Sequence, residues 1–322
     1  MIRPKKCAKS VDEIKVLSPP RRRSPDIVTS HTSVKPGHMK SSGNFYSTVK
    51  VPRERNSRDN SKTGVVITTH GDYGSVAREC VQSYIDHVPR PCYIVLIINV
   101  SDDPETESLE QKLLTNKTTD VIRLTEDNGG LTKTWNMGIE KCKSVGCDTV
   151  ILSNHDLYVD SNITHLISAA KNCPRDSQYY FGPVTNNPGP SAANKCQGST
   201  RALDMDPYVL SNNGRLINLN GFLMCFPIHV LDRNKFDSKH YFNPRLEYAG
   251  NETEWFDRFR TKGGLPILVP KTYVHHYKFA SWRNRKQSQF SVGLIGRGSV
   301  GLVGRGSIGL VGRGSISHAP AV

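Results

Sequence analysis

The chain has 322 residues and a formal net charge of +14 at pH 7, and this length can bury one large hydrophobic core or two modest ones. The charge is confined to the ends, because residues 1–62 carry +10 and residues 283–322 carry +6, whereas residues 63–282 carry −2. A folded nucleic-acid-binding domain is therefore disfavoured, since it would need a basic surface of its own. We expect at most a weak, salt-sensitive contact of the tails with anionic membrane or nucleic acid.

The cysteines and the hydropathy pattern exclude two further classes of protein. The eight cysteines form no C-x-x-C pair, which disfavours a structural zinc site. The sequence has no apolar N-terminal segment and no run of 18 apolar residues, so neither a signal peptide nor a transmembrane helix is predicted. We expect a cytoplasmic protein that could also lie at the periphery of a membrane through its basic tails.

Both ends of the chain have the composition of disordered segments. Residues 1–62 are rich in Lys, Arg, Ser and Pro and lack apolar periodicity, which predicts a disordered basic tail. Residues 283–322 include three copies of an eight-residue repeat, each with three glycines, which predicts a flexible low-complexity tail. A single folded domain is expected between them, at residues 63–282.

Strand and helix patterns alternate in the first half of this domain. Apolar, β-branched runs predict strands, and amphipathic segments predict the helices between them. The strands are expected at 64–70, 92–98, 120–124 and 148–152, and the helices at 75–87, 104–114 and 131–143. This alternation predicts right-handed crossovers and an α/β fold, with a mostly parallel Rossmann-like sheet that carries helices on both faces.

The second half of the domain is less regular. It contains predicted helices at 162–171 and 251–261, a short strand at 179–181, a strand pattern at 216–226 broken at Gly221, and two strands at 265–269 and 273–276. A polar loop at 185–200 is long for a compact domain. Loops of this length are often lids or binding loops, and simple disorder is the alternative.

Polar residues follow each of the first four predicted strands. Because parallel strands end at the same edge of a sheet, these residues are expected to line one crevice, where α/β proteins bind nucleotides. A carboxylate and an imidazole there can hold a divalent metal and, through it, a diphosphate. None of these segments is the G-x-G-x-x-G dinucleotide fingerprint, and no P-loop motif occurs in the chain, which disfavours NAD binding and ATP hydrolysis. The polar segments are His70-Gly-Asp72, Asn99 to Asp103, Asn128-Gly-Gly130 and Asn154-His-Asp156.

One of these segments carries a family resemblance. Residues 127–138, Asp-Asn-Gly-Gly-Leu-Thr-Lys-Thr-Trp-Asn-Met-Gly, resemble the N-x-G-x(5)-N-x-G segment of family 2-like glycosyltransferases with the GT-A fold. Asn154-His-Asp156 stands where that family has its D-x-D motif, after the fourth strand. Gly250-Asn-Glu-Thr-Glu254 resembles the family's G-x-D/E-x-D/E stretch. The resemblance covers roughly residues 64–282 and neither tail.

The resemblance implies a function and a set of site residues. It implies metal-dependent, inverting transfer of a sugar from a UDP- or GDP-sugar to a hydroxyl of a glycan, lipid or protein. Asp156 and a late histidine, for which His275 or His276 fits and His276 is expected, would weakly hold Mn²⁺ or Mg²⁺. Glu252 would be the general base. The donor-binding residues would be His70, Asp72, Asn99, Asp102, Asn128, Gly130, Asn136 and Asn154.

Two departures from the family pattern keep alternatives open. Asn154 replaces the first Asp of D-x-D, and Asn99 stands where an Asp that contacts uracil or ribose is expected. Both favour a catalytically degenerate GT-A fold that serves as a binding or structural module. Glu252 could also be a solvated acid at a helix N-terminus. A nucleotidyltransferase is a further alternative, disfavoured because the Gly-rich, basic signature it needs near the first strand is missing.

Overall fold

In the computed structural model, the described residues are 44–48, 61–70, 74–99, 104–124, 130–186, 201–212 and 215–277. All of them belong to the unit that extends from Met1 to Lys278. The repeat tail expected at 283–322 and most of the polar loop expected at 185–200 lie outside the described residues. None of the described helices is both long and apolar enough to cross a bilayer.

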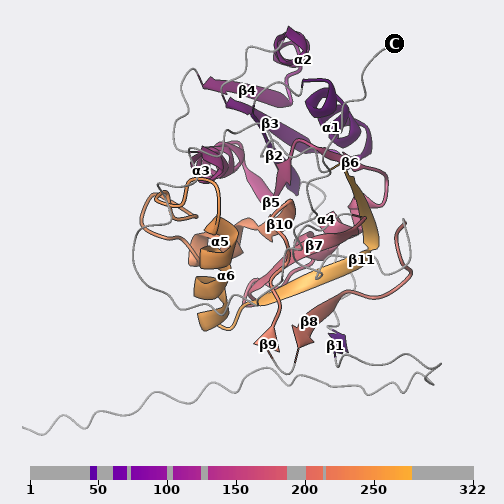
Figure 1. Cartoon of the computed structure of the whole chain (residues 1–322), viewed down its shortest axis with the longest axis vertical. Coiled ribbons are helices and arrows are strands. Elements are labelled where there is room, and N and C mark those ends of the chain that lie inside the picture. Colours follow the sequence, from indigo (N-terminus) through magenta and orange to yellow (C-terminus); the bar gives the residue numbers. More distant parts are fainter. Residues whose placement is uncertain are drawn as a thin grey trace, which may run out of the picture. The chain divides into compact units, whose positions relative to one another are not determined.

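A mixed β-sheet forms the centre of this unit (Figure 1). Its strands are β1 (Asn44–Thr48), β2 (Lys62–His70), β3 (Cys92–Asn99), β4 (Thr119–Leu124), β5 (Cys147–Asn154), β6 (Leu157–Val159), β7 (Tyr179–Thr185), β8 (Tyr208–Asn212), β9 (Arg215–Leu216), β10 (Leu223–Pro227) and β11 (Leu265–His276). Along the sheet their order is β1-β8-β11-β7-β10-β5-β2-β3-β4, while β6 pairs with β11 and β9 with β8. Of the nine strands in that order, only β8 and β10 run against the others.

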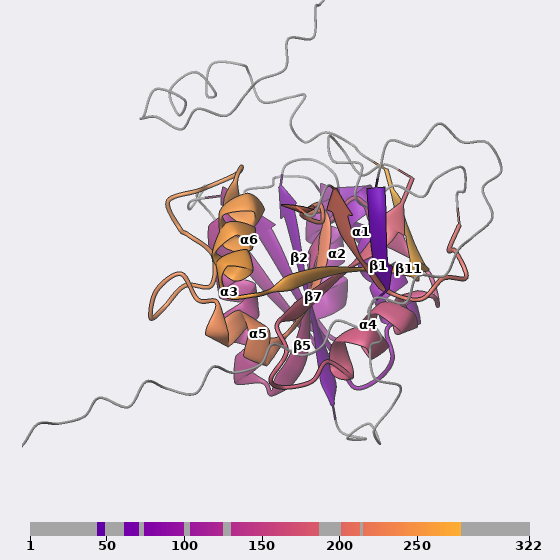
Figure 2. The ribbon, with the colours of Figure 1, turned by 90° about the horizontal axis from the view of Figure 1, so that it is seen from below.

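Six helices of the described chain cover the two faces of the sheet. They are α1 (Gly74–His87), α2 (Pro104–Leu114), α3 (Gly130–Ser144), α4 (Ile163–Lys171), α5 (Ile228–Arg233) and α6 (Asn251–Thr261). Apolar side chains of α1, α2 and α4 enter one core cluster, and those of α3, α5 and α6 enter the other. Figure 2 shows α3, α5 and α6 grouped on one side of the sheet. The expected α/β class with helices on both faces is confirmed.

The central strands are apolar on both sides because each side faces a layer of helices. In β3, Leu96 belongs to the core under α1 and α2, whereas its neighbours Val95 and Ile97 belong to the core under α3. Burial of each such side chain stabilises the fold by about 1.5–3 kcal/mol. An uninterrupted apolar run is the pattern of a parallel strand buried on both faces, which explains why these strands were predicted correctly.

The structure differs from the sequence-based expectations where strands far apart in the sequence pair with each other. The basic tail expected to be disordered contributes β1, which pairs with β8, so the prediction is wrong for residues 44–48. The two late strands are one strand, β11, because a register shift against β7 between Val269 and Tyr273 accommodates the chain around Pro270. The pattern at 216–226 divides into β9 and β10.

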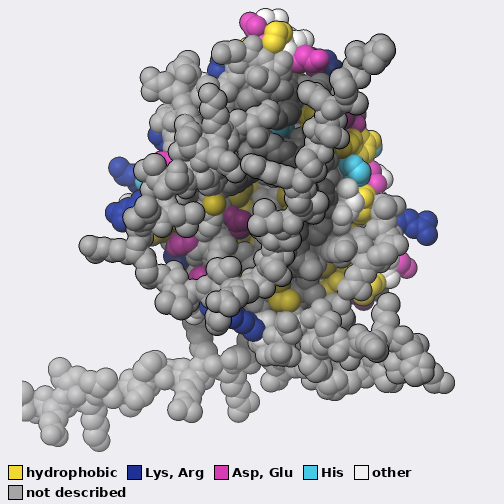
Figure 3. All heavy atoms as spheres, viewed as in Figure 1, with side chains coloured by type: hydrophobic (Ala, Val, Ile, Leu, Met, Phe, Trp, Pro, Cys, Tyr) yellow, Lys and Arg dark blue, Asp and Glu magenta, His cyan; other side chains and the backbone are white. Residues whose placement is uncertain are grey.

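Among the described residues of this unit, the charged side chains do not form one basic patch. Figure 3 shows Lys and Arg interspersed with Asp and Glu on the described surface in view. The ion pairs are scattered as well, among them Arg78–Glu105 and Lys271–Asp204. Surface pairs of this kind contribute little to stability.

Gly138 allows α3 to approach the sheet closely. A β-carbon at this position would overlap the side chain of Val66 in β2, which is fully buried and β-branched. Such a side chain has little freedom to move aside. The glycine therefore has a packing role in the middle of a helix, where glycine is otherwise unfavourable.

Replacing Gly138 with alanine tests this contact, because the sign of the change in stability shows which of two effects is larger. Helix propensity alone predicts a gain of about 1 kcal/mol, whereas overpacking against Val66 predicts a loss of about 1–3 kcal/mol. We expect the loss, measured as the free energy of unfolding in urea. Ser144→Ala, at the exposed end of the same helix, should change stability by less than about 0.5 kcal/mol. A more stable Gly138→Ala protein would contradict the packing role.

Candidate active site

Asp156 and His276 meet where β5 and β11 end. The chain leaves β5 at Asn154 and enters β6, which pairs antiparallel with the last residues of β11, so that Leu157 lies opposite His276. The N–H of Tyr277 donates to the carbonyl of Asp156 (3.0 Å). Three residues of strand pairing therefore fix the backbones that carry the two side chains.

The two side chains form a buried pair with one unused oxygen. Nε2 of His276 lies 3.3 Å from Oδ2 of Asp156, and the side chains are only 10% and 8% exposed. The other carboxylate oxygen, Oδ1, is buried and has no hydrogen-bond partner among the described residues. A buried carboxylate oxygen without a partner is costly. The pair is therefore incomplete without a cation or a donor.

Two residues that the sequence did not single out hold His276 in place. The ring of Phe222 stacks on the imidazole, with centroids 5.2 Å apart and planes at 23°. The N–H of His276 donates to Oδ1 of Asn186 (2.8 Å), whose Nδ2 donates back to the carbonyl of His276 (3.3 Å). Asn186 belongs to the predicted polar loop, but its contact with residue 276 had no signal in the sequence.

The alternation of side chains along β11 separates the two histidines. His276 is buried and faces Asp156, whereas His275 is half-buried with its ring 4.7 Å from that of Tyr277. The structure thus places His276, and not His275, beside the carboxylate. This choice between adjacent residues follows from the two-residue period of a strand.

The Asp156–His276 pair fits part of a divalent metal site. Carboxylate oxygen and imidazole nitrogen are both ligands for Mn²⁺, and Oδ1, which no described residue bonds, is available as a donor atom. Nε2 of His276 and Oδ2 of Asp156 lie 3.3 Å apart. This distance is within the spacing of about 3.0–3.4 Å between adjacent ligands of an octahedral ion. Among the described residues, no group of three or more His, Cys, Asp or Glu side chains gathers to complete such a site.

The neighbours of Asp156 in the sequence have different surroundings. Asn154 is partly exposed, and its backbone is held because its N–H donates to the carbonyl of Phe222 (2.9 Å). His155 is buried, with Nδ1 3.3 Å from the carbonyl of Thr68 in β2. The His155 ring thus contacts the adjacent strand, and the backbone of Asn154 is bonded to the segment that carries Phe222.

Glu252 lies close to the same region from the other side. It stands in the first turn of α6, after Gly250 in the left-handed conformation (φ 78°). Its side chain covers Gly221, because a β-carbon at Gly221 would lie 3.3 Å from the Glu252 carboxyl carbon. The next residue is Phe222, which stacks on His276. Glu252 and His276 therefore contact adjacent residues of one segment.

The segment behind the family resemblance has structural roles in this chain. The amide oxygen of Asn136 accepts from the N–H groups of Tyr241 and Phe242 (both 2.9 Å), and its Nδ2 donates to the carbonyl of Phe242 (3.0 Å). Gly130 has φ 71°, and a β-carbon there would lie 2.5 Å from the carbonyl oxygen of Glu247. These contacts join α3 to the chain that precedes α6, so Asn136 is left out of the donor site proposed below.

The remaining expected donor-binding residues are only partly described. His70 ends β2 directly opposite Asn99 at the end of β3, which is the edge expected for a nucleotide crevice. Asn99 is 1% exposed, so its side chain is buried rather than open to a ligand. Asp72, Asp102 and Asn128 lie outside the described residues.

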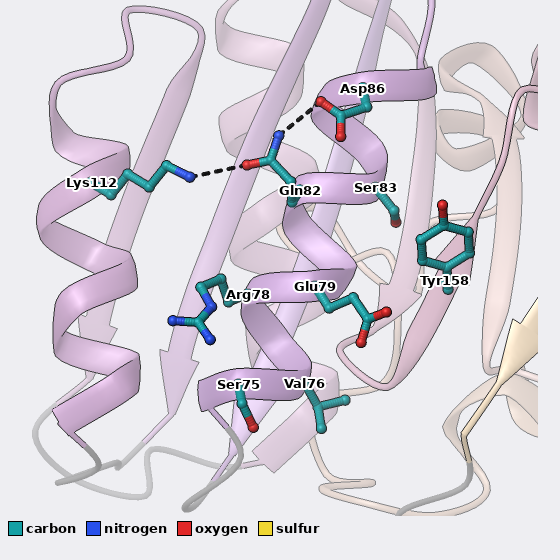
Figure 4. Close-up of a pocket in the computed structure, with 9 residues that line it drawn as sticks. All are labelled: Ser75, Val76, Arg78, Glu79, Gln82, Ser83, Asp86, Lys112 and Tyr158. Carbon is teal, nitrogen blue, oxygen red and sulfur yellow. Dashed lines mark hydrogen bonds between the residues drawn. The ribbon is translucent and has the colours of Figure 1, made fainter.

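A concavity of about 560 Å³ lies over the outer face of α1, apart from these residues (Figure 4). Its polar groups bond to one another, since Lys112 of α2 donates to Gln82 (3.1 Å) and Gln82 donates to Asp86 (2.8 Å). None of the expected site residues lines it. Its lining is Ser75, Val76, Arg78, Glu79, Gln82, Ser83, Asp86, Lys112 and Tyr158.

Replacing Asn136 tests its structural role. Asn136→Ala would leave two buried backbone N–H groups without an acceptor, so we expect a loss of about 2–4 kcal/mol in unfolding free energy. Asn172→Ala removes an exposed amide that donates to Ser168 (3.3 Å) and should cost less than about 0.5 kcal/mol. Equal stability of the two variants in urea denaturation would rule out the role assigned to Asn136.

Comparison with known proteins identifies the fold. No protein-family model and no curated protein sequence matches the chain. The chain is similar to the crystal structure of GalNAc-T7 with UDP, GalNAc and Mn²⁺, with a TM-score of 0.55 and 19% identity over 68% of this chain and 44% of that chain. A second match is S. aureus TarS 1-349, with a TM-score of 0.48 and 14% identity over 67% of this chain and 60% of that one. This chain thus spans less than half of GalNAc-T7. It has a GT-A glycosyltransferase-like fold, as its sequence resemblance predicted.

Proposed function

We propose that this protein is a glycosyltransferase that moves a sugar from a nucleoside diphosphate donor to a hydroxyl acceptor, with inversion at the anomeric carbon. The observation that carries the proposal is the buried Asp156–His276 pair at the carboxyl edge of the sheet, where one carboxylate oxygen has no partner among the described residues. Ligands of open α/β sheets bind at this edge. The UDP and Mn²⁺ in the GalNAc-T7 crystal support a UDP- or GDP-sugar as the donor class and a divalent metal as the cofactor.

Asp156 and His276 would hold the metal in this proposal. The ion, when bound, would neutralise negative charge on the leaving diphosphate. Asn154 supplies a neutral amide where the family has a carboxylate, so the site carries one negative charge fewer and should bind Mn²⁺ or Mg²⁺ weakly. The stacked Phe222 and the Asn186 amide keep the imidazole in position before any ligand arrives, which lowers the ordering cost of binding.

Glu252 would act as the general base. Its carboxylate would accept the proton of the acceptor hydroxyl while the acceptor oxygen bonds to the anomeric carbon and the bond to the diphosphate breaks. Its place beside Gly221, the residue before Phe222, brings it near the His276 side of the site. Attack from the face opposite the leaving group gives inversion. The acceptor, whether glycan, lipid or protein, would enter on the side of α6.

Asp156→Asn tests the metal and nucleotide site. We expect UDP or GDP to bind the full chain in the presence of Mn²⁺, and the variant to bind at least about tenfold more weakly, as measured by calorimetry. Asp148→Asn is the matched control, because Asp148 lies at the other end of β5 and is exposed; its affinity should equal that of the unmodified protein. Loss of affinity in both variants would point to a general effect of charge and contradict the assignment.

Glu252→Gln separates catalysis from donor binding. We expect kcat for nucleotide release from a UDP- or GDP-sugar to fall by about 10²–10⁴, with the nucleotide affinity unchanged. Asp257→Asn, an exposed acid on the same helix, should leave kcat unaltered. A Glu252→Gln protein as active as the unmodified one would remove Glu252 from the mechanism.

A catalytically degenerate binding module is the second candidate. Two observations favour it, namely Asn154 in the place of an acid and the lack of a third metal-ligating side chain among the described residues. The same experiments separate the two functions. Metal-dependent nucleotide binding without sugar transfer or donor hydrolysis, across UDP- and GDP-sugars, would favour the binding module.

A further inference from the structure

Two cysteines share one small space at the edge of the sheet away from the candidate site. Cys142 lies in the last turn of α3 and Cys147 begins β5, joined by a turn that contains Gly146 at φ 80°. The opposite end of β5 leads to Asp156. The proposed transfer reaction uses neither thiol.

Gly64 of β2 provides the space for both sulfur atoms. A β-carbon on Gly64 would lie 2.5 Å from Sγ of Cys142 and 3.2 Å from Sγ of Cys147. The two sulfur atoms therefore lie close to each other above this glycine. Glycine inside a strand often marks a close approach of other groups. Here any larger residue would displace one sulfur from the other.

Charged groups make the two thiols unequal. The adjacent Cys142 thiol lowers the pKa of Cys147 against the effect of burial, and Lys62 and Lys171 lower it further while Asp148 opposes them. The adjacent Cys147 thiol and full burial raise the pKa of Cys142 well above its usual value. Nζ of Lys62 is held over the connecting turn by a bond to the carbonyl of Val145 (2.7 Å).

At three other buried thiols the effect of burial on the pKa dominates. Burial raises the pKa of Cys80, Cys92 and Cys173 to about 12. Access does not separate Cys147 from Cys173, which is 7% exposed, but within the pair Cys147 keeps 5% of its surface exposed and Cys142 none. Reactive thiols are found where positive charge favours the thiolate and where some access remains. Of this pair, only Cys147 meets both conditions.

We propose that Cys147 and Cys142 form a redox-active dithiol that reduces a hydroperoxide, with Cys147 as the attacking thiolate and Cys142 as the resolving thiol. Cys147 sulfur bonds to one peroxide oxygen, the O–O bond breaks, and hydroxide or alkoxide leaves, which makes a sulfenic acid. Cys142 sulfur then bonds to Cys147 sulfur, the S–O bond breaks, and hydroxide leaves with the Cys142 proton as water. The peroxide gains the two electrons that the sulfurs lose.

The resulting disulfide would join the end of α3 to the start of β5. Both elements run from this pair to the opposite edge of the sheet, where β5 leads to Asp156 and α3 begins at Gly130. Oxidation of the pair would thus link two elements, α3 and β5, that support the candidate site. Reduction by a dithiol would restore the free pair.

The full chain treated with one equivalent of hydrogen peroxide tests the proposal. We expect the loss of two of the eight thiols, as titrated in denaturant, and their recovery after reduction with dithiothreitol. Lys143 lies between the two cysteines, so trypsin places them in different peptides and a disulfide appears as a linked pair in mass spectrometry. A different linked pair, such as Cys92 with Cys147, or no linked pair, would overturn the proposal.

Single substitutions assign the two roles. Cys142→Ser should stop at the sulfenic acid of Cys147, which dimedone traps, and Cys147→Ser should consume no peroxide. Cys173→Ser is the control for loss of a buried thiol and should behave as the unmodified protein. Because the serine variants can fail to fold, the fold of each is checked by circular dichroism. The rate of alkylation of the unmodified chain at pH 7 is a second measure of thiol reactivity. Iodoacetamide should label Cys147 at least about tenfold faster than Cys173, and equal rates would contradict the proposal.

Discussion

Burial of β2, β3 and β5 on both faces is the constraint on which the rest of the structure depends. Side chains such as Val95 and Leu96 point in opposite directions into two apolar cores, so the middle of these strands has no place for an exposed polar group. Polar residues must therefore lie where the strands end. Because these three strands are parallel, their carboxyl ends form one edge, and the candidate site of this chain lies along it.

The site itself depends on contacts between segments far apart in the sequence. The β6–β11 pairing brings residue 156 to residue 276, and Phe222, from a third segment, packs on the histidine. Glu252 reaches the same segment through Gly221. Each of these side chains is fixed by backbone pairing or packing before a ligand binds. A preorganised arrangement of this kind would suit the proposed role of orienting a charged diphosphate.

The resemblance to glycosyltransferases identified the fold more securely than it identified ligand contacts. Asn136 and Gly138 match the family segment, yet in this chain Asn136 bonds to the backbone of Tyr241 and Phe242, and Gly138 makes room for Val66. A motif can therefore recur because its residues are needed for packing and backbone hydrogen bonds. The same principle applies to Gly64, whose missing side chain leaves room for two thiols.

The sequence alone determined the alternation of strands and helices, the α/β class, the position of Asp156 after the fourth strand and that of Glu252 at the start of a helix. These features depend on periodicity and on local end signals, which neighbouring residues encode. Only the tertiary structure decided that His276 rather than His275 faces Asp156, that Phe222 and Asn186 hold it, that residues 44–48 join the sheet, and that Cys142 meets Cys147 above Gly64. These contacts depend on strand order and register, which join residues that are mostly distant in the chain and therefore leave no local pattern in the sequence.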